Sequence, residues 1–429
     1  MNVLTIRSLL LVLAFALPVG FLACSSTGEN NNNSNSNGNA NTNSNGNENS
    51  NSNGTQVVLP KAEMGKTIKL VPNPNFPKEV KTQPANNNLD VIRFDGRLFL
   101  AFRTAPKHFA SDQVEMYVVS TKDEKTWEFE AKFFQKTDLR EPRFFVWKDK
   151  LQIYFAQLGK SQTAFEPGQM FKSTRNKLGD WTQEEKVFKP GFIPWRFREY
   201  QGKPIMVGYD GGENIYKFNG EPLHVYLLTT TDGKTWAPFN PAREFVLKGG
   251  TSETDIAFDD AGNLFAVARN EAGDKDGFGS KICRATKDDI TKWTCKPDPK
   301  KYDSPLLFTH KNEIYLVGRR NMTETGHYDL QQKEELTLQQ RATENQAAYW
   351  KEPKRCSLWH VNKVTLKVKH ILDLPSRGDT CFPSILKNSD NQYTIYNYSS
   401  DIDGPDRGWL DGQLAPTFIY SHILKFTSP

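Results

Sequence analysis

The chain has 429 residues, with 55 Lys and Arg against 50 Asp and Glu, which gives a formal charge of +5. This positive excess is small for the length and no long basic run occurs, so nucleic acid is not expected as a partner. The mean hydropathy is −0.63. No apolar run reaches the roughly 20 residues that a membrane-spanning helix needs, which disfavours an integral membrane protein.

The first 23 residues are typical of a secretion signal, with Arg7 followed by an apolar run from Leu9 that continues to Leu22. The sequence Phe-Leu-Ala-Cys24 then resembles a bacterial lipobox, in which the cysteine is lipidated and becomes the mature N-terminus. Phe in place of the usual Leu leaves cleavage by the ordinary signal peptidase as the alternative. Because Ser25 rather than Asp follows the cysteine, resemblance to Gram-negative sorting rules favours the outer membrane. We expect an extracytoplasmic protein, lipid-anchored to the outer membrane or cell surface.

Residues 24–55 consist of this cysteine and a tract of Asn, Ser and Gly. The tract has almost no apolar groups to bury and cannot offset the entropy of ordering, so it is interpreted as a disordered tether. Three segments follow from this composition: a signal peptide over 1–23, the tether over 24–55, and a globular part over 56–429.

Besides Cys24, the chain has an even number of cysteines in a compartment expected to be oxidising, which favours disulfides. They are Cys283, Cys295, Cys356 and Cys381. Cys283 and Cys295 flank a predicted hairpin turn, where a bridge would close a short loop. A zinc site is the alternative, but no CxxC or HxH spacing supports it.

Four tryptophans recur about every 55 residues, a period that indicates repeated supersecondary units. They are Trp127, Trp181, Trp236 and Trp293. The segments 121–127 and 230–236 share the pattern Thr-x-Asp-x-Lys-Thr-Trp, in which the aspartate accepts backbone N–H groups inside a turn. This pattern resembles the Asp-box (BNR repeat) of sialidase-type β-propellers, a motif with a structural role.

Paired apolar runs separated by turn signals recur through the globular part and are typical of strands. As first and second runs they are 91–94 and 98–102, 144–147 and 151–155, 197–200 and 205–208, 256–258 and 264–268, 306–308 and 314–317, and 385–386 and 393–396. With aromatics throughout, they predict an all-β, six-bladed β-propeller of four-stranded blades. Residues 67–71 would supply the strand that completes the last blade.

The segment 329–351 is rich in Gln, Glu, Leu and Ala, and it predicts a helical insertion in the fifth blade that ends before Pro353. The helix leaves the predicted sheet at the end of a second strand. It is interpreted as a lid or rim wall, with a solvated decoration as the alternative.

The starts of first strands and the ends of second strands fall on one face of such a propeller, and they are rich in charge. The residues expected to bind substrate there are Arg103, Arg140, Arg143, Arg196, Tyr209, Arg269, Glu271, Arg319 and Tyr398. Guanidinium groups bind carboxylate, sulfate or phosphate in two-pronged fashion, so an anionic ligand is favoured. The candidate catalytic carboxylates are Glu253, Asp255, Asp379 and Glu141. Structural ion pairs are the alternative for any of these residues.

The whole globular part resembles the sialidase superfamily in its repeats, its turn motif and its strand pattern. The resemblance implies three arginines on the sugar carboxylate, a tyrosine nucleophile assisted by a glutamate, and an aspartic acid. Arg269 and Arg319 match the second and third arginines by blade position, Glu253 matches the glutamate, and Asp112 lies in the loop of the acid. The first arginine is missing, and Phe382 stands where the nucleophile belongs. A conventional sialidase is therefore not expected.

Two functions remain as hypotheses. The first is a glycoside hydrolase that acts on an anionic glycan or polysaccharide through a carboxylate pair, about 5–5.5 Å apart if retaining or 6.5–9.5 Å if inverting. The second is a non-catalytic propeller that binds glycan or protein. In either case we expect a monomer without cofactor or metal, attached to the membrane through its lipid anchor only.

Overall fold

The computed structural model describes residues 58–217, 221–332 and 335–427. The predicted signal segment, Cys24 and the tether lie outside these residues. Within the described ranges, no helix combines the length and the apolar character needed to cross a membrane.

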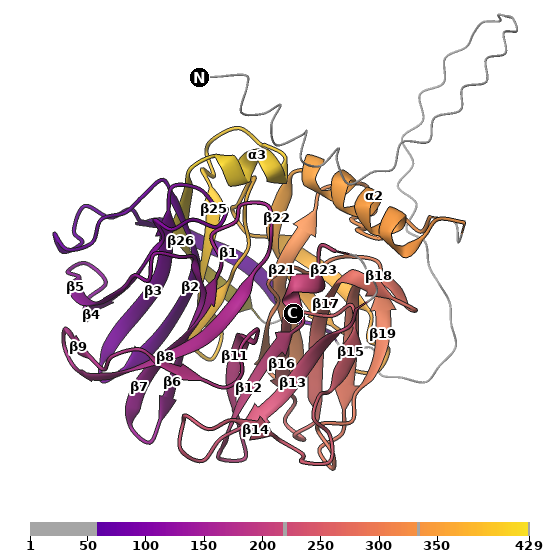
Figure 1. The fold of residues 1–429 in the computed structure, drawn as a ribbon, viewed down its shortest axis with the longest axis horizontal. Helices are drawn as coiled ribbons and strands as arrows, with labels where there is room; N and C mark the ends of the chain where they lie inside the picture. Colours follow the sequence, from indigo (N-terminus) through magenta and orange to yellow (C-terminus); the bar gives the residue numbers. More distant parts are fainter. Residues whose placement is uncertain (1–57, 218–220, 333–334, 428–429) are drawn as a thin grey trace, which may run out of the picture. The chain divides into compact units, whose positions relative to one another are not determined.

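The described part is nearly all β (Figure 1). Most neighbouring strands pair antiparallel, and most pairs are consecutive along the chain. Two five-stranded sheets lie between residues 139 and 249. One contains β6 (Leu139–Trp147), β7 (Lys150–Leu158), β8 (Pro167–Lys177), β9 (Asp180–Trp181) and β10 (Glu185–Val187). The other contains β11 (Ile193–Tyr200), β12 (Lys203–Asp210), β13 (Leu223–Thr229), β14 (Ala237–Pro238) and β15 (Leu247–Gly249), with the 3-10 helix η1 (Gly212–Asn214) between β12 and β13.

Two further sheets have four strands each. The first contains β16 (Thr254–Phe258), β17 (Leu264–Asp274), β18 (Gly277–Ala285) and β19 (Thr294–Asp298). The second contains β20 (Leu306–His310), β21 (Glu313–Asn321), β22 (Lys354–Val361) and β23 (Val368–Asp373). All of the strand pairs predicted from the apolar runs in these four sheets are present as hairpins.

The remaining sheet has eight strands and combines the two ends of the described chain. Its strands are β1 (Lys61–Val71), β2 (Ala85–Phe94), β3 (Arg97–Ala105), β4 (Glu115–Thr121), β5 (Glu128–Phe133), β24 (Ser384–Ser389), β25 (Gln392–Ser400) and β26 (Thr417–Thr427). β2 meets β26 in parallel only at Ala85 and Thr417, so two antiparallel four-stranded groups join at one point. β1 pairs with β26, as predicted for residues 67–71. In Figure 1 the yellow strands accordingly lie beside the indigo ones.

The first strands of successive sheets lie next to one another: β2 contacts β6 and β24, β11 contacts β6 and β16, and β16 contacts β20. Carboxylates connect them. Asp90 of β2 accepts from the Phe144 backbone N–H at 2.8 Å, and Asp255 of β16 accepts from the Leu307 N–H at 2.7 Å. A buried backbone N–H without an acceptor is costly, so these carboxylates help hold neighbouring sheets together.

The two predicted aspartate turns form as expected. Asp123 Oδ1 accepts from the backbone N–H groups of Lys125 and Thr126, and Asp232 Oδ1 accepts from those of Lys234 and Thr235, all at 2.7–2.8 Å. These bonds lower the pKa of Asp123 to about 2. Trp127 and Trp236 follow the turns and are buried, so the motif anchors each turn to the core.

Both pairs of cysteines are disulfide-bonded, as expected. Cys283 and Cys295 are cross-strand partners in β18 and β19, and Cys356 of β22 bonds to Cys381 just before β24. The second bridge connects two sheets, because β22 and β24 belong to different ones.

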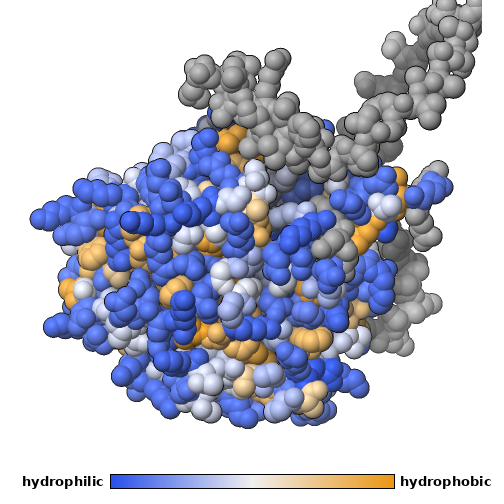
Figure 2. Space-filling view, in the orientation of Figure 1, coloured by the Kyte–Doolittle hydropathy of each residue, from blue (hydrophilic) through white to orange (hydrophobic). Residues whose placement is uncertain are grey.

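Within the predicted 329–351 segment, α2 (Leu338–Lys351) begins at residue 338 because Thr337 and Gln340 form a capping box. It lies beside α3 (Trp409–Leu414) at one end of the sheets (Figure 1). Tyr328, Tyr349 and Trp409 pack together under these helices. The face seen in Figure 2 is largely hydrophilic, with apolar residues scattered over it.

Candidate functional site

The backbone is irregular near the starts of the first strands β2, β6 and β20. Asn88, Glu141 and Ser304 have positive φ angles of 40°, 56° and 51°. The β2–β3 and β6–β7 pairings shift register at Asn88 and Glu141, as in a β-bulge. Such bulges re-aim side chains near the end of a strand and cost backbone strain, which is common at functional sites.

Glu141 is re-aimed toward the start of β2, where Asn88 Nδ2 donates to its Oε1 at 3.2 Å. Its Oε2 has no hydrogen-bond partner and lies 3.8 Å from Arg143 Nη2. Burial raises the pKa of Glu141 to about 7; Arg143 opposes the shift and the nearby charge of Glu253 adds to it. Glu141 is thus a carboxyl group that holds a proton close to neutral pH.

Glu253 precedes β16 and is held on both oxygens. Oε1 lies 3.0 Å from Arg269 Nη1, and Oε2 accepts from the Ser304 N–H at 2.7 Å. Burial raises the pKa of Glu253, while Arg269 and the Ser304 bond favour its ionised form. The two glutamates differ in their partners: Glu253 has a cation and a backbone donor, and Glu141 has one amide.

A buried ion network supports Arg269. Its Nη1 also lies 3.2 Å from Glu271, and Lys301 bonds to Glu271 at 2.7 Å. Asp303 accepts from Arg319 at 2.6 Å and from Tyr349 of α2 at 2.8 Å. The predicted rim helix therefore supplies a side chain to this network.

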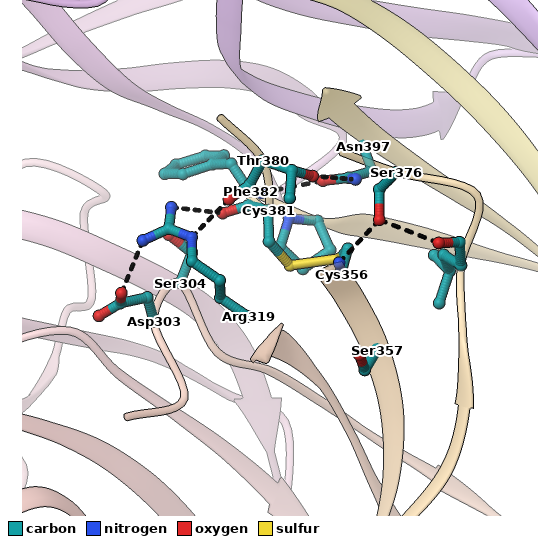
Figure 3. Close-up of a disulfide and its surroundings, with 12 residues drawn as sticks. Asp303, Ser304, Arg319, Cys356, Ser357, Ser376, Thr380, Cys381, Phe382 and Asn397 are labelled. Carbon is teal, nitrogen blue, oxygen red and sulfur yellow. Dashed lines mark hydrogen bonds and ion pairs between the residues drawn. A yellow bond between two sulfur atoms is a disulfide. The ribbon is translucent and has the colours of Figure 1, made fainter. Parts of the chain in front are cut away.

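Arg319 is fixed from two sides (Figure 3). On one side its guanidinium contacts Asp303, and on the other it donates to the backbone oxygens of Thr380 and Cys381. The Cys356–Cys381 disulfide ties this segment to β22, the strand next to the one that carries Arg319. The disulfide thus secures the carbonyl groups that orient the guanidinium.

A second chain of contacts starts at Arg103. Asp138 bridges Arg103 at 2.8 Å and Arg140 at 2.6 Å, and Arg140 donates to the backbone oxygen of His108. His108 Nδ1 lies 2.6 Å from Asp379 Oδ2. Burial lowers the pKa of His108 although Asp379 counteracts it, so the ring is neutral and donates its Nδ1 proton to the carboxylate.

Exposure divides these groups into two sets. Five charged or titratable side chains retain 10–15% of their surface, and we call them the strand-start cluster: His108, Arg140, Glu141, Glu253 and Arg269. The groups that hold them are 0–1% exposed, namely Asp138, Glu271, Lys301, Asp303 and Asp379. Only the first set has surface left for a ligand.

The structure places the other predicted residues deeper. Asp255 is fully buried and accepts from Arg198, Ile256 N–H and Leu307 N–H. Arg143 and Arg196 lie beside it, further along the first strands. The phenols of Tyr209 and Tyr398 are 2% exposed, and burial raises both pKa values well above the ordinary range. Neither is therefore poised as a nucleophile.

Sequence reasoning missed three contributors. His108 comes from a loop, and the sequence indicated it only by its place, shortly after the end of the second strand β3. Asp138 precedes a first strand and could have been included by the rule that found Glu141. Tyr216 follows η1, is 46% exposed and lies within electrostatic reach of Arg269 and Glu271.

Asp112, which was expected in the loop of the acid, lines a separate cavity of about 580 Å³ with Lys81, Glu115 and other residues.

No group of three or more His, Cys, Asp or Glu side chains in the described ranges is arranged to hold a metal ion. No protein-family model matches the sequence, and no curated protein matches it either.

Solved structures do resemble the fold. A Dyadobacter fermentans protein of unknown function is 14% identical with a TM-score of 0.58, over 86% of this chain and 100% of that one. Trypanosoma rangeli sialidase is 13% identical with a TM-score of 0.51, over 86% of this chain and 60% of the sialidase. The same sialidase in complex with sialic acid gives 12% identity and a TM-score of 0.50. At these identities the likeness concerns the fold alone, and it favours a propeller-like arrangement of the sheets.

Proposed function

We propose that the sheets form a closed six-bladed β-propeller of the sialidase type, with the strand-start cluster at one end of its axis. Three observations support this. The first strands of successive sheets contact one another, β26 returns to β2, and the two aspartate turns have the hydrogen bonds of Asp-boxes. The fifth blade carries the α2 insertion.

We propose further that the protein is a glycoside hydrolase of this propeller class that acts on an anionic glycan. The observation that carries the proposal is the pair Glu141 and Glu253. Both are partly exposed, burial raises the pKa of both, and the charge of Glu253 adds to the shift of Glu141. They differ in partners, because a cation and a backbone N–H favour the ionised form of Glu253. Two carboxyl groups in unlike surroundings are what glycoside hydrolysis requires.

The roles follow from those surroundings. Glu141, with a pKa of about 7 and an unpaired Oε2, is the proton donor to the departing oxygen. Glu253, whose ionised form Arg269 and the Ser304 N–H favour, is the base or nucleophile. A tyrosine nucleophile is not part of this mechanism, since Phe382 is buried against Trp195 and Arg143.

Arg140 and Arg269 are the cations that retain exposure, and they would meet the anionic group of the glycan. His108, oriented by Asp379, lies with Nε2 3.4 Å from Arg140 Nη1 and holds that guanidinium in place. Tyr216 offers an exposed ring for contact with a sugar face. We also propose that Cys24 and the tether present this site on the cell surface.

The alternative is a propeller that binds glycan or protein without turnover. It is favoured by the pairing of the arginines: Arg103 and Arg319 already bond to Asp138 and Asp303. Arginines whose charges are already balanced by carboxylates are as compatible with a binding site as with a catalytic one.

The experiment that separates the two uses a soluble form that begins near Gln56. It is incubated with sialylated, uronate-containing and sulfated glycans, and products are identified by mass. The Arg269→Ala/Glu253→Ala double variant is the control, and Arg243→Ala, at an exposed ion pair with Asp289, is the matched variant outside the site. A product made by the wild type and Arg243→Ala but not by the double variant supports the hydrolase. Depletion of a glycan without any product would replace it with the binding protein.

A further inference from the structure

A second cavity lies further along the first strands, past the strand-start cluster. It measures about 500 Å³ and is lined by residues of β2, β6, β11, β16, β20 and β24. Three arginines face it: Arg143, Arg196 and Arg198. We call it the arginine chamber. It is distinct from the proposed glycan site, because the chamber lining contains neither Glu141 nor Glu253.

Two of these arginines are 1% and 3% exposed and have donors without acceptors. Arg143 Nε and Nη2 make no hydrogen bond, although Nη1 donates to the Leu89 oxygen at 3.4 Å. Arg196 Nε makes none either, while its Nη2 donates to the Pro305 and Pro383 oxygens. A buried charged donor without an acceptor carries a large desolvation penalty, so an acceptor is expected at these nitrogens.

The charges around the chamber do not supply that acceptor. Asp90 is occupied by Ser384 Oγ and the Phe144 N–H. Asp255 is occupied by Arg198 and two backbone N–H groups, and Arg196 Nε lies 3.5 Å from it without a hydrogen bond.

Glu141 is the remaining charged neighbour. It lies 3.8 Å from Arg143 Nη2, too far for a hydrogen bond. Its raised pKa of about 7 leaves it partly neutral. Three guanidinium groups therefore face two engaged aspartates, and their mutual repulsion adds to burial in lowering the pKa of Arg196 to about 9. A positive excess in a partly enclosed chamber attracts an anion.

We propose that the arginine chamber binds a small inorganic anion, held between Arg143 and Arg196 by the guanidinium N–H groups that have no hydrogen-bond acceptor in the described protein. The anion compensates the third positive charge and bridges the neighbouring first strands β6 and β11, which carry Arg143 and Arg196. The anion is of the class of chloride, sulfate and phosphate, because the guanidinium groups offer positive charge and N–H donors to a ligand that accepts hydrogen bonds.

The test is anion titration of the wild-type protein in sodium gluconate at constant ionic strength. Chloride binding is followed by the line width of the chloride NMR signal, with sulfate and phosphate as competitors. We expect saturable broadening that a competitor displaces. Arg196→Met should weaken binding by about tenfold or more, as expected from the loss of charge-assisted hydrogen bonds.

Two controls locate the site. Arg284→Met, on the exposed surface, should leave the broadening unchanged. Arg269→Met measures what the strand-start cluster binds, and the component of the broadening that Arg196→Met removes should persist in it. If Arg196→Met does not fold, a bromide-soaked crystal of the wild type replaces it, with an anomalous peak expected between Arg143 and Arg196. Absence of saturable broadening, its loss in Arg269→Met instead, or bromide peaks confined to other places would overturn the proposal.

Discussion

Glu253 and Asp255 are two residues apart at the start of the same strand, yet the structure gives them different surroundings. Asp255 is fully buried, and its oxygens accept from Arg198 and from backbone N–H groups of its own and the next sheet. Glu253 keeps 12% of its surface; one oxygen pairs with Arg269 and the other accepts from the Ser304 N–H, just before β20. Both carboxylates therefore contact the segment of the next sheet, but of the two only Glu253 keeps surface that can meet a ligand.

The same division recurs at β2 and β6. Asp90 connects β2 to β6 and β24 through Phe144 and Ser384. Glu141, displaced by a bulge, has an oxygen without a partner and a raised pKa. Carboxylates deeper along the strands therefore maintain the fold, and those at the strand starts are available for chemistry.

The largest expected effect concerns Asp255. Asp255→Ala should lower the free energy of unfolding by about 3–5 kcal/mol, because it leaves Arg198 and the Leu307 N–H without their acceptor. Glu253→Gln should lower it by less than Asp255→Ala does, because the amide oxygen can still accept from the Ser304 N–H and Arg269 keeps Glu271 as a partner. Urea unfolding of both variants measures the difference. Equal losses would remove the distinction between the two carboxylates.

The next effect is the pH dependence caused by Glu141. Its pKa is raised in the folded state from 4.5 to about 7, so between these values the unfolded chain has lost a proton that the folded protein retains. Stability contributed by this group should therefore fall as the pH rises through that window, by up to about 3 kcal/mol, and stay level above it.

Urea midpoints at a series of pH values test this. Glu141→Gln, which cannot ionise, should be stabilised relative to the wild type above pH 7 and differ little from it near pH 4.5. Glu244→Gln, at a group away from the cluster, should follow the wild type. Parallel curves for wild type and Glu141→Gln would show that the carboxyl group titrates normally.

A smaller effect is expected at the rim helix. Tyr349→Phe removes the bond from the phenol to Asp303 and should destabilise the protein by about 1 kcal/mol. Thermal unfolding measures the change, and Tyr216→Phe, at an exposed phenol, is the matched control. If the two variants behave alike, α2 does not support the ion network.

The smallest effect is expected at the aspartate turns. Asp232→Ala removes acceptors for Lys234 and Thr235 in an exposed turn and should cost less than about 1 kcal/mol, with glycan turnover unchanged. A loss of turnover at preserved stability would give the turn a role in function that its position does not suggest.

The strands, the aspartate turns and the disulfide between Cys283 and Cys295 could be predicted from the sequence because each depends on local pattern and spacing. The same holds for the concentration of charge at the strand starts. The different burial of Glu253 and Asp255 could not be predicted, since Asp255 is covered by Arg198 and the Leu307 N–H, which are distant from it in the sequence. His108 was missed because its position is set by a loop and by Asp379, which is 271 residues away.

The most direct measurement is glycan turnover per folded molecule for Glu253→Gln and Asp255→Asn, in the assay that gives a product with the wild type. We expect Glu253→Gln to fold and to lose turnover by about 100-fold or more, as expected for a catalytic carboxylate. We expect the folded fraction of Asp255→Asn to turn over at close to the wild-type rate. An active Glu253→Gln, or an inactive but fully folded Asp255→Asn, would contradict this division between the two carboxylates.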